Sequence, residues 1–243
     1  MANEVLANGW TAVPIDPSKL FDGNAYRNVP APLKVAEIAW PSDDPLVSKM
    51  QTYAKEHLSQ EVYNHSMRVY YFATIILKQQ FPEFATSLSP STLALTCLFH
   101  DIGATDKNMS ATRMSFEFYG GIMALNILEA AGSTKDQAAA VCECIIRHQD
   151  LGTDGSITFL GQLIHLATIY DNVSDHPYVS GLDTIIHEET REEVIALFPR
   201  NGWLGCFARA VTKEMELKPW SHTTHIPGFA DKILANKLMK QYE

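Results

Sequence analysis

The chain has 243 residues, of which 46% are hydrophobic and 19% charged, and its net charge is −9 at pH 7. This composition allows one sizeable core, and an acidic balance without a basic stripe argues against nucleic acid as a partner. No apolar run reaches the roughly 18–20 residues that span a bilayer, so no membrane partner is expected. The first residues lack the basic and apolar regions of a secretory signal.

The four cysteines form no CxxC pair and mostly lie in apolar, helix-like stretches; they are Cys97, Cys142, Cys144 and Cys206. Such cysteines are typical of reduced, core-filling thiols. We therefore expect a cytoplasmic protein.

Residues 1–41 differ from the rest of the chain because they contain five prolines and little hydrophobic periodicity. We expect them to form an extended N-terminal arm that packs on the domain and is anchored by Trp10 and Trp40.

From residue 42 onward the pattern is helical. Capping side chains and prolines begin several of these segments, and apolar residues recur at helical spacing. The expected helices cover 42–58, 60–81, 89–99, 115–131, Ser133 or Thr134 to His148, 156–172 and, more roughly, 188–198, 203–217 and 227–241. No segment alternates with period two, so we predict one all-α domain over residues 42–243.

His100 and Asp101 lie side by side where the apolar run "TLALTCLFHDIG" ends. A carboxylate is costly to bury there unless a cation meets it. His65 and His148 face inward on their expected helices, and Asp171 lies at the polar end of another. Each residue alone has an ordinary structural explanation, but together they would leave unpaired buried polar atoms unless a divalent metal gathered them.

The order His65, His100-Asp101, Asp171 resembles the HD-domain metal motif. The resemblance implies a single all-helical HD-domain bundle, with the motif inside 65–171 and one divalent metal held by these four side chains. The superfamily leaves the function broad, because most of its members are phosphohydrolases.

Two departures from the superfamily narrow the function. Ala104 stands where many HD phosphohydrolases have a phosphate-binding lysine, and Phe116 stands where the dinuclear type has a histidine. The site therefore looks mononuclear and suited to a small neutral molecule.

A finer resemblance runs through nearly the whole chain. The stretches "GWTAVP", "YNHSMRVYYF", "FHDIGATDKNMSATRMSFEFYGG", "LIHLATIYDN" and "KPWSHTTHIPGF" are similar to those of fungal cyanamide hydratases. This resemblance implies a hydro-lyase that hydrates cyanamide to urea, as in detoxification, with one zinc ion per chain; iron or manganese is less favoured. A metal-bound hydroxide would attack the nitrile carbon.

Within such a site, His148 is the best-placed donor to the negative charge that develops on nitrogen. Thr168, one helical turn before Asp171, could orient the nucleophile or bind the substrate's amino group. We therefore assign catalytic roles to His148, Thr168 and Asp101, substrate binding to His148 and Thr168, and metal binding to His65, His100, Asp101 and Asp171.

Alternatives stay open at this point. The protein could be an HD-type phosphohydrolase acting on a nucleotide or phosphodiester, an isonitrile hydratase, or a non-catalytic helical sensor that keeps its metal for stability. A homo-oligomer is possible.

Three features near the site have more than one interpretation. His165 is expected to be a packed or surface residue rather than part of the site. His222 and His225 have the spacing of a metal pair, but prolines on both sides argue against a helix there. That segment could instead close the pocket with Trp220 and Phe229.

Overall fold

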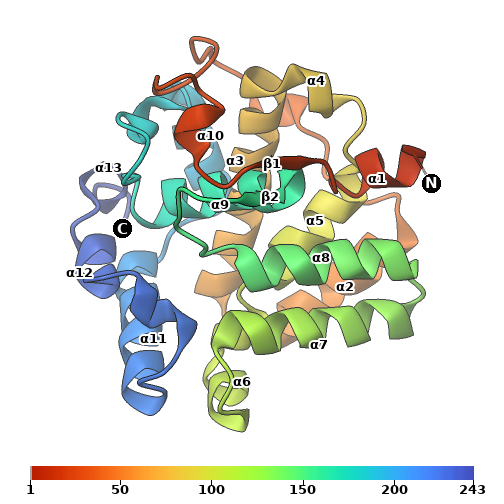
Figure 1. Cartoon of the computed structure of the whole chain (residues 1–243), viewed down its shortest axis with the longest axis vertical. Coiled ribbons are helices and arrows are strands. Elements are labelled where there is room, and N and C mark those ends of the chain that lie inside the picture. The colour runs from red at the N-terminus through yellow and green to blue at the C-terminus, as the bar shows by residue number, and fades with distance from the viewer. Residues whose placement is uncertain (1) are drawn as a thin grey trace.

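The computed structural model describes residues 2–243, which form a mostly helical chain (Figure 1); Met1, the first residue of the expected arm, lies outside the described residues. The longer α-helices are α2 Pro45–His57, α3 Gln60–Gln80, α5 Pro90–Phe99, α7 Phe116–Ala131, α8 Lys135–Arg147, α9 Phe159–Asn172, α10 Glu188–Leu197 and α11 Trp203–Leu217. The short ones are α1 Ala2–Ala7, α4 Pro82–Ala85, α6 Asp106–Ala111, α12 Phe229–Leu234 and α13 Lys237–Lys240.

The expected helix starts rest on side-chain caps that the structure contains. Asp44 accepts hydrogen bonds from the first turn of α2, Ser89 caps α5, and Thr134 caps α8. Gly132 ends α7 in the left-handed region, with φ of 99°, where glycine carries no Cβ penalty. The prediction of a mostly helical chain is confirmed.

The prediction of an all-α domain did not include two short strands that the structure contains. Residues 12–14 form β1 (Ala12–Pro14), which pairs antiparallel with β2 (Ser156–Thr158). The helix expected from residue 156 therefore begins at Phe159, after Thr158 caps it. Three-residue strands are too short for an alternating pattern to be visible in the sequence.

The segment expected as one helix over 227–241 is two short helices. Gly228, with φ of 65°, precedes α12. Asn236 then interrupts the helix and caps α13 by accepting a hydrogen bond from Met239. An asparagine side chain that bonds the backbone in this way competes with helix continuation.

Helix α3 is the centre of the molecule. Every side chain from Tyr63 to Leu77 is buried, and the helix packs against α5 and α9. A helix buried all round places even its polar residues inside the protein, and His65 is one of them.

Helix α7 packs on the turn that follows His100-Asp101. A Cβ atom on Gly103 would lie 2.0 Å from the carbonyl oxygen of Phe116, so only glycine allows the two backbones to approach this closely. The pair α7 and α8 lies side by side along one face of the molecule (Figure 1). This packing fixes the turn after Asp101 between two helix ends.

The described part of the expected N-terminal arm is not extended throughout, because it begins with α1 and contains β1 and two 3-10 turns, η1 (Pro17–Lys19) and η2 (Val35–Glu37). The Trp10 indole donates to Asp136 at 3.2 Å, and the Trp40 ring lies edge-on to Tyr70 at 4.7 Å. That residues 1–41 form an element separate from the domain stays a prediction.

A second, smaller apolar cluster joins α11 and α12 and contains Trp203, Phe207 and Phe229.

All four cysteines are free thiols, and two of them are fully buried. Within residues 2–243, no helix combines the length and the apolar character needed to cross a membrane.

Candidate functional site

Three helix-borne side chains meet at the centre of the molecule. His65 comes from the middle of α3, and His100 and Asp101 follow the end of α5, before the 3-10 turn η3 (Ile102–Ala104). All three are at most 1% exposed. Their ligand atoms all lie within 4.8 Å of one another, so this group can hold a metal ion.

The distances within this group are short. The Nε2 atoms of His65 and His100 are 3.1 Å apart, and the Asp101 Oδ2 atom lies 3.5 Å from the first and 3.3 Å from the second. Neither carboxylate oxygen of Asp101 has a hydrogen-bond partner. A buried carboxylate without a partner requires a compensating cation.

The hydrogen bonds of the histidines fix which ring nitrogen faces the group. The Nδ1 atom of His100 lies 2.8 Å from the Cys97 carbonyl oxygen, and Nδ1 of His65 lies 2.6 Å from Asp171 Oδ2. Both acceptors lack protons, so Nδ1–H donates in each case, and each ring, when neutral, turns its Nε2 lone pair towards the other. Two facing lone pairs beside a carboxylate are compatible with a cation between them, as in histidine metal sites.

His148 presents a third Nε2 atom to the same carboxylate. It follows α8, its Nδ1 lies 2.7 Å from the Ile145 carbonyl oxygen, and its Nε2 lies 3.7 Å from Asp101 Oδ1. It is buried like the other two histidines, but it lies outside the compact group of three. Because Nδ1–H is bound to a carbonyl, neutral His148 offers a lone pair, not a proton, to the site.

Burial and the local charges keep most of these rings neutral. Burial lowers the pKa of His65 to about 4 and, together with His100, lowers the pKa of His148. Burial alone would lower the pKa of His100 too, but the Asp101 carboxylate outweighs it and the net pKa is raised. Burial would raise the pKa of Asp101, yet the neighbouring histidines, His100 first, hold it well below its ordinary value. The carboxylate is therefore ionised.

Asp171, expected from the sequence as the fourth ligand, does not join the group. It lies on the far side of the His65 ring, against Nδ1, and its oxygens also accept hydrogen bonds from Arg68 at 2.9–3.1 Å and from Arg200. Both arginines are fully buried. These two cations hold the pKa of Asp171 well below its usual range, although burial opposes them. Its carboxylate is thus already saturated by partners other than a metal.

Sequence reasoning missed Arg68, Arg200 and Trp203. Arg68 lies three positions after His65, on the same inward face of α3, which was a usable signal. Arg200 lies in a loop, where no periodic pattern in the sequence indicates that a side chain faces inward. The Trp203 indole stacks on the His65 ring with the ring centroids 4.1 Å apart, and its N–H donates to Asn172 at 2.7 Å. The hydrogen bond orients the indole, and the stacking in turn fixes the plane of the His65 ring.

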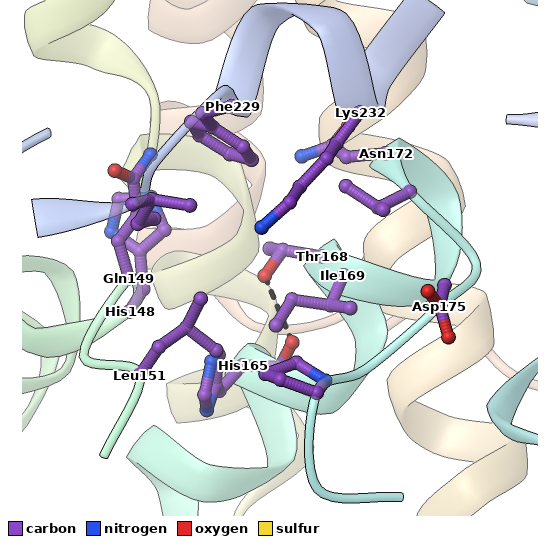
Figure 2. A pocket seen from close by; sticks show the side chains of 13 residues that line it. His148, Gln149, Leu151, His165, Thr168, Ile169, Asn172, Asp175, Phe229 and Lys232 are labelled. Carbon is purple, nitrogen blue, oxygen red and sulfur yellow. Dashed lines mark hydrogen bonds between the residues drawn. The ribbon is translucent and has the colours of Figure 1, made fainter. Parts of the chain in front are cut away.

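A small cavity of about 40 Å³ is lined by His148, whose Nε2 atom lies 3.7 Å from Asp101, but not by His65, His100 or Asp101 themselves. Figure 2 shows His148, Thr168 and His165 around it, with Phe229 and Lys232 reaching in from α12. Thr168 is buried, and its hydroxyl donates to the His165 carbonyl oxygen at 3.1 Å. A cavity needs roughly 10–15 Å³ to hold one water molecule. At about 40 Å³, this cavity therefore fits a molecule of a few heavy atoms.

A wider cleft of about 610 Å³ reaches Asp101 and shares no lining residue with the cavity. Trp203, Arg209 and Lys213 belong to its walls. The wider cleft thus reaches the group of three at Asp101, whereas the small cavity ends at His148, which separates it from the group.

His222 and His225 do not join a metal-binding group within the described part of the chain. They form the 3-10 turn η5 (His222–His225), in which the two rings stack at 4.2 Å and His222 Nδ1 lies 2.8 Å from Glu117 Oε1. The segment after this turn closes the cavity through Ile226 and Phe229, whereas Trp220 is 62% exposed.

Comparison with known proteins gives full-length relatives. The chain is 41% identical over 230 residues to cyanamide hydratase DDI2 of Saccharomyces cerevisiae, across 94% of this chain and 96% of the yeast protein. Cyanamide hydratase DDI3 of the same yeast matches with the same identity and the same coverage. No family model matches the chain.

Proposed function

Because the chain belongs to the cyanamide hydratase family, we propose that it is a hydro-lyase that adds water to cyanamide, N≡C–NH2, to give urea, with one zinc ion per chain. The observation that carries the proposal is that the Nε2 atoms of His65 and His100 face each other at 3.1 Å beside the Asp101 carboxylate, whose oxygens form no hydrogen bond within the described residues. A cavity of about 40 Å³ beside His148, the histidine that neighbours this group, is consistent with a substrate of three heavy atoms.

His65, His100 and Asp101 would hold the metal. Imidazole nitrogens and a carboxylate are ligands that zinc accepts, and a catalytic site keeps a further position open. Zinc, when bound, supplies a Lewis acid that makes water a better nucleophile near neutral pH. The same donor set would also accept iron or manganese, and metal analysis distinguishes them.

We assign His148 the proton transfer. Its Nδ1–H is bound to a carbonyl oxygen, so its Nε2 lone pair can accept a proton from the attacking water. The water oxygen then bonds to the nitrile carbon, and the proton on His148 passes to the nitrile nitrogen as the triple bond becomes a double bond. The product of this step is isourea, which rearranges to urea by moving one further proton. From the sequence, His148 was expected only to donate a proton. Because its Nδ1–H is bound to the Ile145 carbonyl oxygen, we propose that it first accepts that proton from water.

Thr168 would orient the reactants. Because its hydroxyl proton is bound to the His165 carbonyl oxygen, its oxygen lone pairs are free to accept a hydrogen bond from water or from the substrate's amino group. We assign Asp171 a positioning role instead of a ligand role, because it holds the His65 ring through Nδ1 and is itself fixed by Arg68 and Arg200.

The test is urea formation from cyanamide by purified protein, before and after treatment with a chelator. We expect about one zinc per chain, loss of turnover on chelation and recovery when zinc is added back. His148→Ala should keep its metal and lose turnover, whereas Asp101→Ala should lose both. Absence of urea formation by the zinc-loaded protein, or release of phosphate from nucleotides in its place, would overturn the proposal. Hydration of an isonitrile in preference to cyanamide would reassign the substrate.

A further inference from the structure

His165 is a buried polar residue that forms no hydrogen bond with any side chain or backbone group of residues 2–243. It lies on α9, is 1% exposed, and neither of its ring nitrogens has a hydrogen-bond partner. Buried polar groups in proteins nearly always have a partner, and an unpaired one lowers stability. The residue therefore calls for a partner that the chain itself does not provide.

The position of His165 indicates where that partner would lie. The side chain lines the small cavity together with His148 and Thr168, and Figure 2 shows it at the end of the cavity opposite α12. Much of the remaining wall is apolar, from Leu151 and Ile169. The wall also carries polar side chains, of which the Asp175 carboxylate is exposed to solvent, and His165 is a buried one that is free to form a hydrogen bond with a ligand in the cavity.

The ring of His165 is neutral. Burial, followed by the neighbouring His176 and His148, lowers its pKa well below the ordinary value. A neutral imidazole carries one N–H donor and one acceptor nitrogen. Such a ring can accept a hydrogen bond from an amino group without placing a charge in the cavity.

We propose that His165 is a substrate-binding residue that accepts a hydrogen bond from the amino group of cyanamide, so that the nitrile carbon faces the His65–His100–Asp101 group. This inference rests on the proposed function. Cyanamide has a donor end, the NH2 group, and an acceptor end, the nitrile nitrogen. An acceptor at the far end of the cavity makes the productive orientation the favoured one.

Other groups in the cavity wall are less suited to this role. Lys232 only donates hydrogen bonds, and the Asn172 side-chain oxygen already accepts from Trp203. Gln149 lines the same cavity, and its Oε1 atom also lacks a partner. Gln149 is therefore one competing acceptor and the Thr168 oxygen is another, so Gln149→Leu and Thr168→Val both belong in the experiment.

The test compares His165→Leu with Gln149→Leu, with Thr168→Val and with a matched control, Gln162→Leu. Gln162 lies one turn before His165 on α9, is 1% exposed, and both its amide atoms lack partners, but it does not line the cavity. In zinc-loaded protein, we expect His165→Leu to raise KM for cyanamide roughly three- to tenfold, the effect of one lost hydrogen bond. The value of kcat should fall less than KM rises, and zinc content should be unchanged. Gln162→Leu should keep the wild-type KM.

Thermal unfolding separates substrate binding from a structural role. A leucine at position 165 removes an unsatisfied polar group, so the melting temperature should stay the same or rise. The variants His165→Asn and His165→Gln place a polar atom near Nδ1 or Nε2, and one of them should restore KM at least in part.

Four results would overturn the inference. They are a wild-type KM in His165→Leu, a lowered melting temperature in that variant, no restoration by either amide variant, and a KM increase confined to Gln149→Leu or Thr168→Val. If wild-type protein forms no urea at all, the proposed function fails as well. Urea formation by the wild type together with any of the four results leaves the proposed function intact.

Discussion

Two buried aspartates of the site have opposite electrostatic surroundings. Asp101 faces three imidazole rings but no hydrogen-bond donor within bonding distance, whereas Asp171 is paired with Arg68, Arg200 and His65. An unpaired buried charge opposes folding, and a paired one depends on its partners. The surroundings of Asp101 suit a metal ligand, and those of Asp171 suit a residue that holds its neighbours in position.

Replacing each aspartate by asparagine should therefore have different effects on metal-free protein. Asp171→Asn leaves the buried Arg68 guanidinium without a countercharge and takes from Arg200 one of its two carboxylate partners, so it should lower the free energy of unfolding by about 3–5 kcal/mol. Asp101→Asn removes a charge that only the nearby imidazole rings offset, so it should lower this free energy much less than Asp171→Asn does, while it abolishes zinc binding. Guanidinium chloride unfolding with metal analysis measures both effects. Equal destabilisation by the two variants would contradict the distinction drawn between these residues.

At the level of elements, the turn after Asp101 is held by its contact with α7. The Gly103 backbone lies directly against the Phe116 carbonyl oxygen at the start of that helix. The same turn carries Asp101, so the position of the carboxylate depends on how closely α7 can approach.

Gly103→Ala should consequently disturb both stability and metal binding. The added methyl group would lie 2.0 Å from the Phe116 carbonyl oxygen, and such overpacking in a core typically destabilises by about 1–3 kcal/mol or more. Gly152→Ala is a matched control, since its Cβ would meet only a side-chain atom at 3.7 Å. Unfolding curves and zinc titrations of both variants test this prediction, which a normal zinc affinity in Gly103→Ala would refute.

The segment that closes the cavity is tied to α7 by His222. The hydrogen bond from its ring to Glu117 is the main cause of its raised pKa, and Asp150 at 3.6 Å and Glu214 contribute. Because the folded-state pKa exceeds the unfolded one, the interaction stabilises the fold fully below about pH 6.5. The stabilisation is lost as the pH rises through the folded-state value.

His222→Gln should remove this pH dependence. The difference in unfolding free energy between wild type and variant should be about 1 kcal/mol or less, since the pair is partly exposed, and should shrink above pH 6.5. Denaturant unfolding from pH 5 to 8 measures it. A difference that grows with pH would have the wrong sign and would exclude the proposed ion pair.

At the scale of the whole molecule, the metal-binding group joins distant parts of the chain. His65 belongs to the central helix α3, and His100 and Asp101 follow α5. The Asp171–Arg200 pair extends the network to Glu243, which accepts from Arg200 at 2.6 Å. Binding of an ion at this junction should therefore stabilise the folded chain as a unit.

Zinc should raise the melting temperature of the whole protein. An ion that binds only the folded state stabilises it by about 2.7 kcal/mol at a free concentration of 100 times Kd, which corresponds to roughly 5–11 °C for a chain of this size. Scanning calorimetry of chelator-treated protein at rising zinc concentrations measures the shift. Asp101→Asn serves as the control and should show no shift; an equal shift in that variant would place the ion elsewhere.

The sequence by itself determined the mostly helical class and most of the long helices, and it predicted His65, His100 and Asp101 as metal ligands, together with Asp171. Local signals carried these predictions, because caps, helical periodicity and inward-facing polar residues are visible along the chain. The tertiary structure alone decided that Asp171 lies behind His65, because Arg200 reaches it from a loop with no periodic signal. It also decided that His165 lies unpaired in a cavity, since a missing hydrogen-bond partner can be recognised only when every neighbour from other elements is in place.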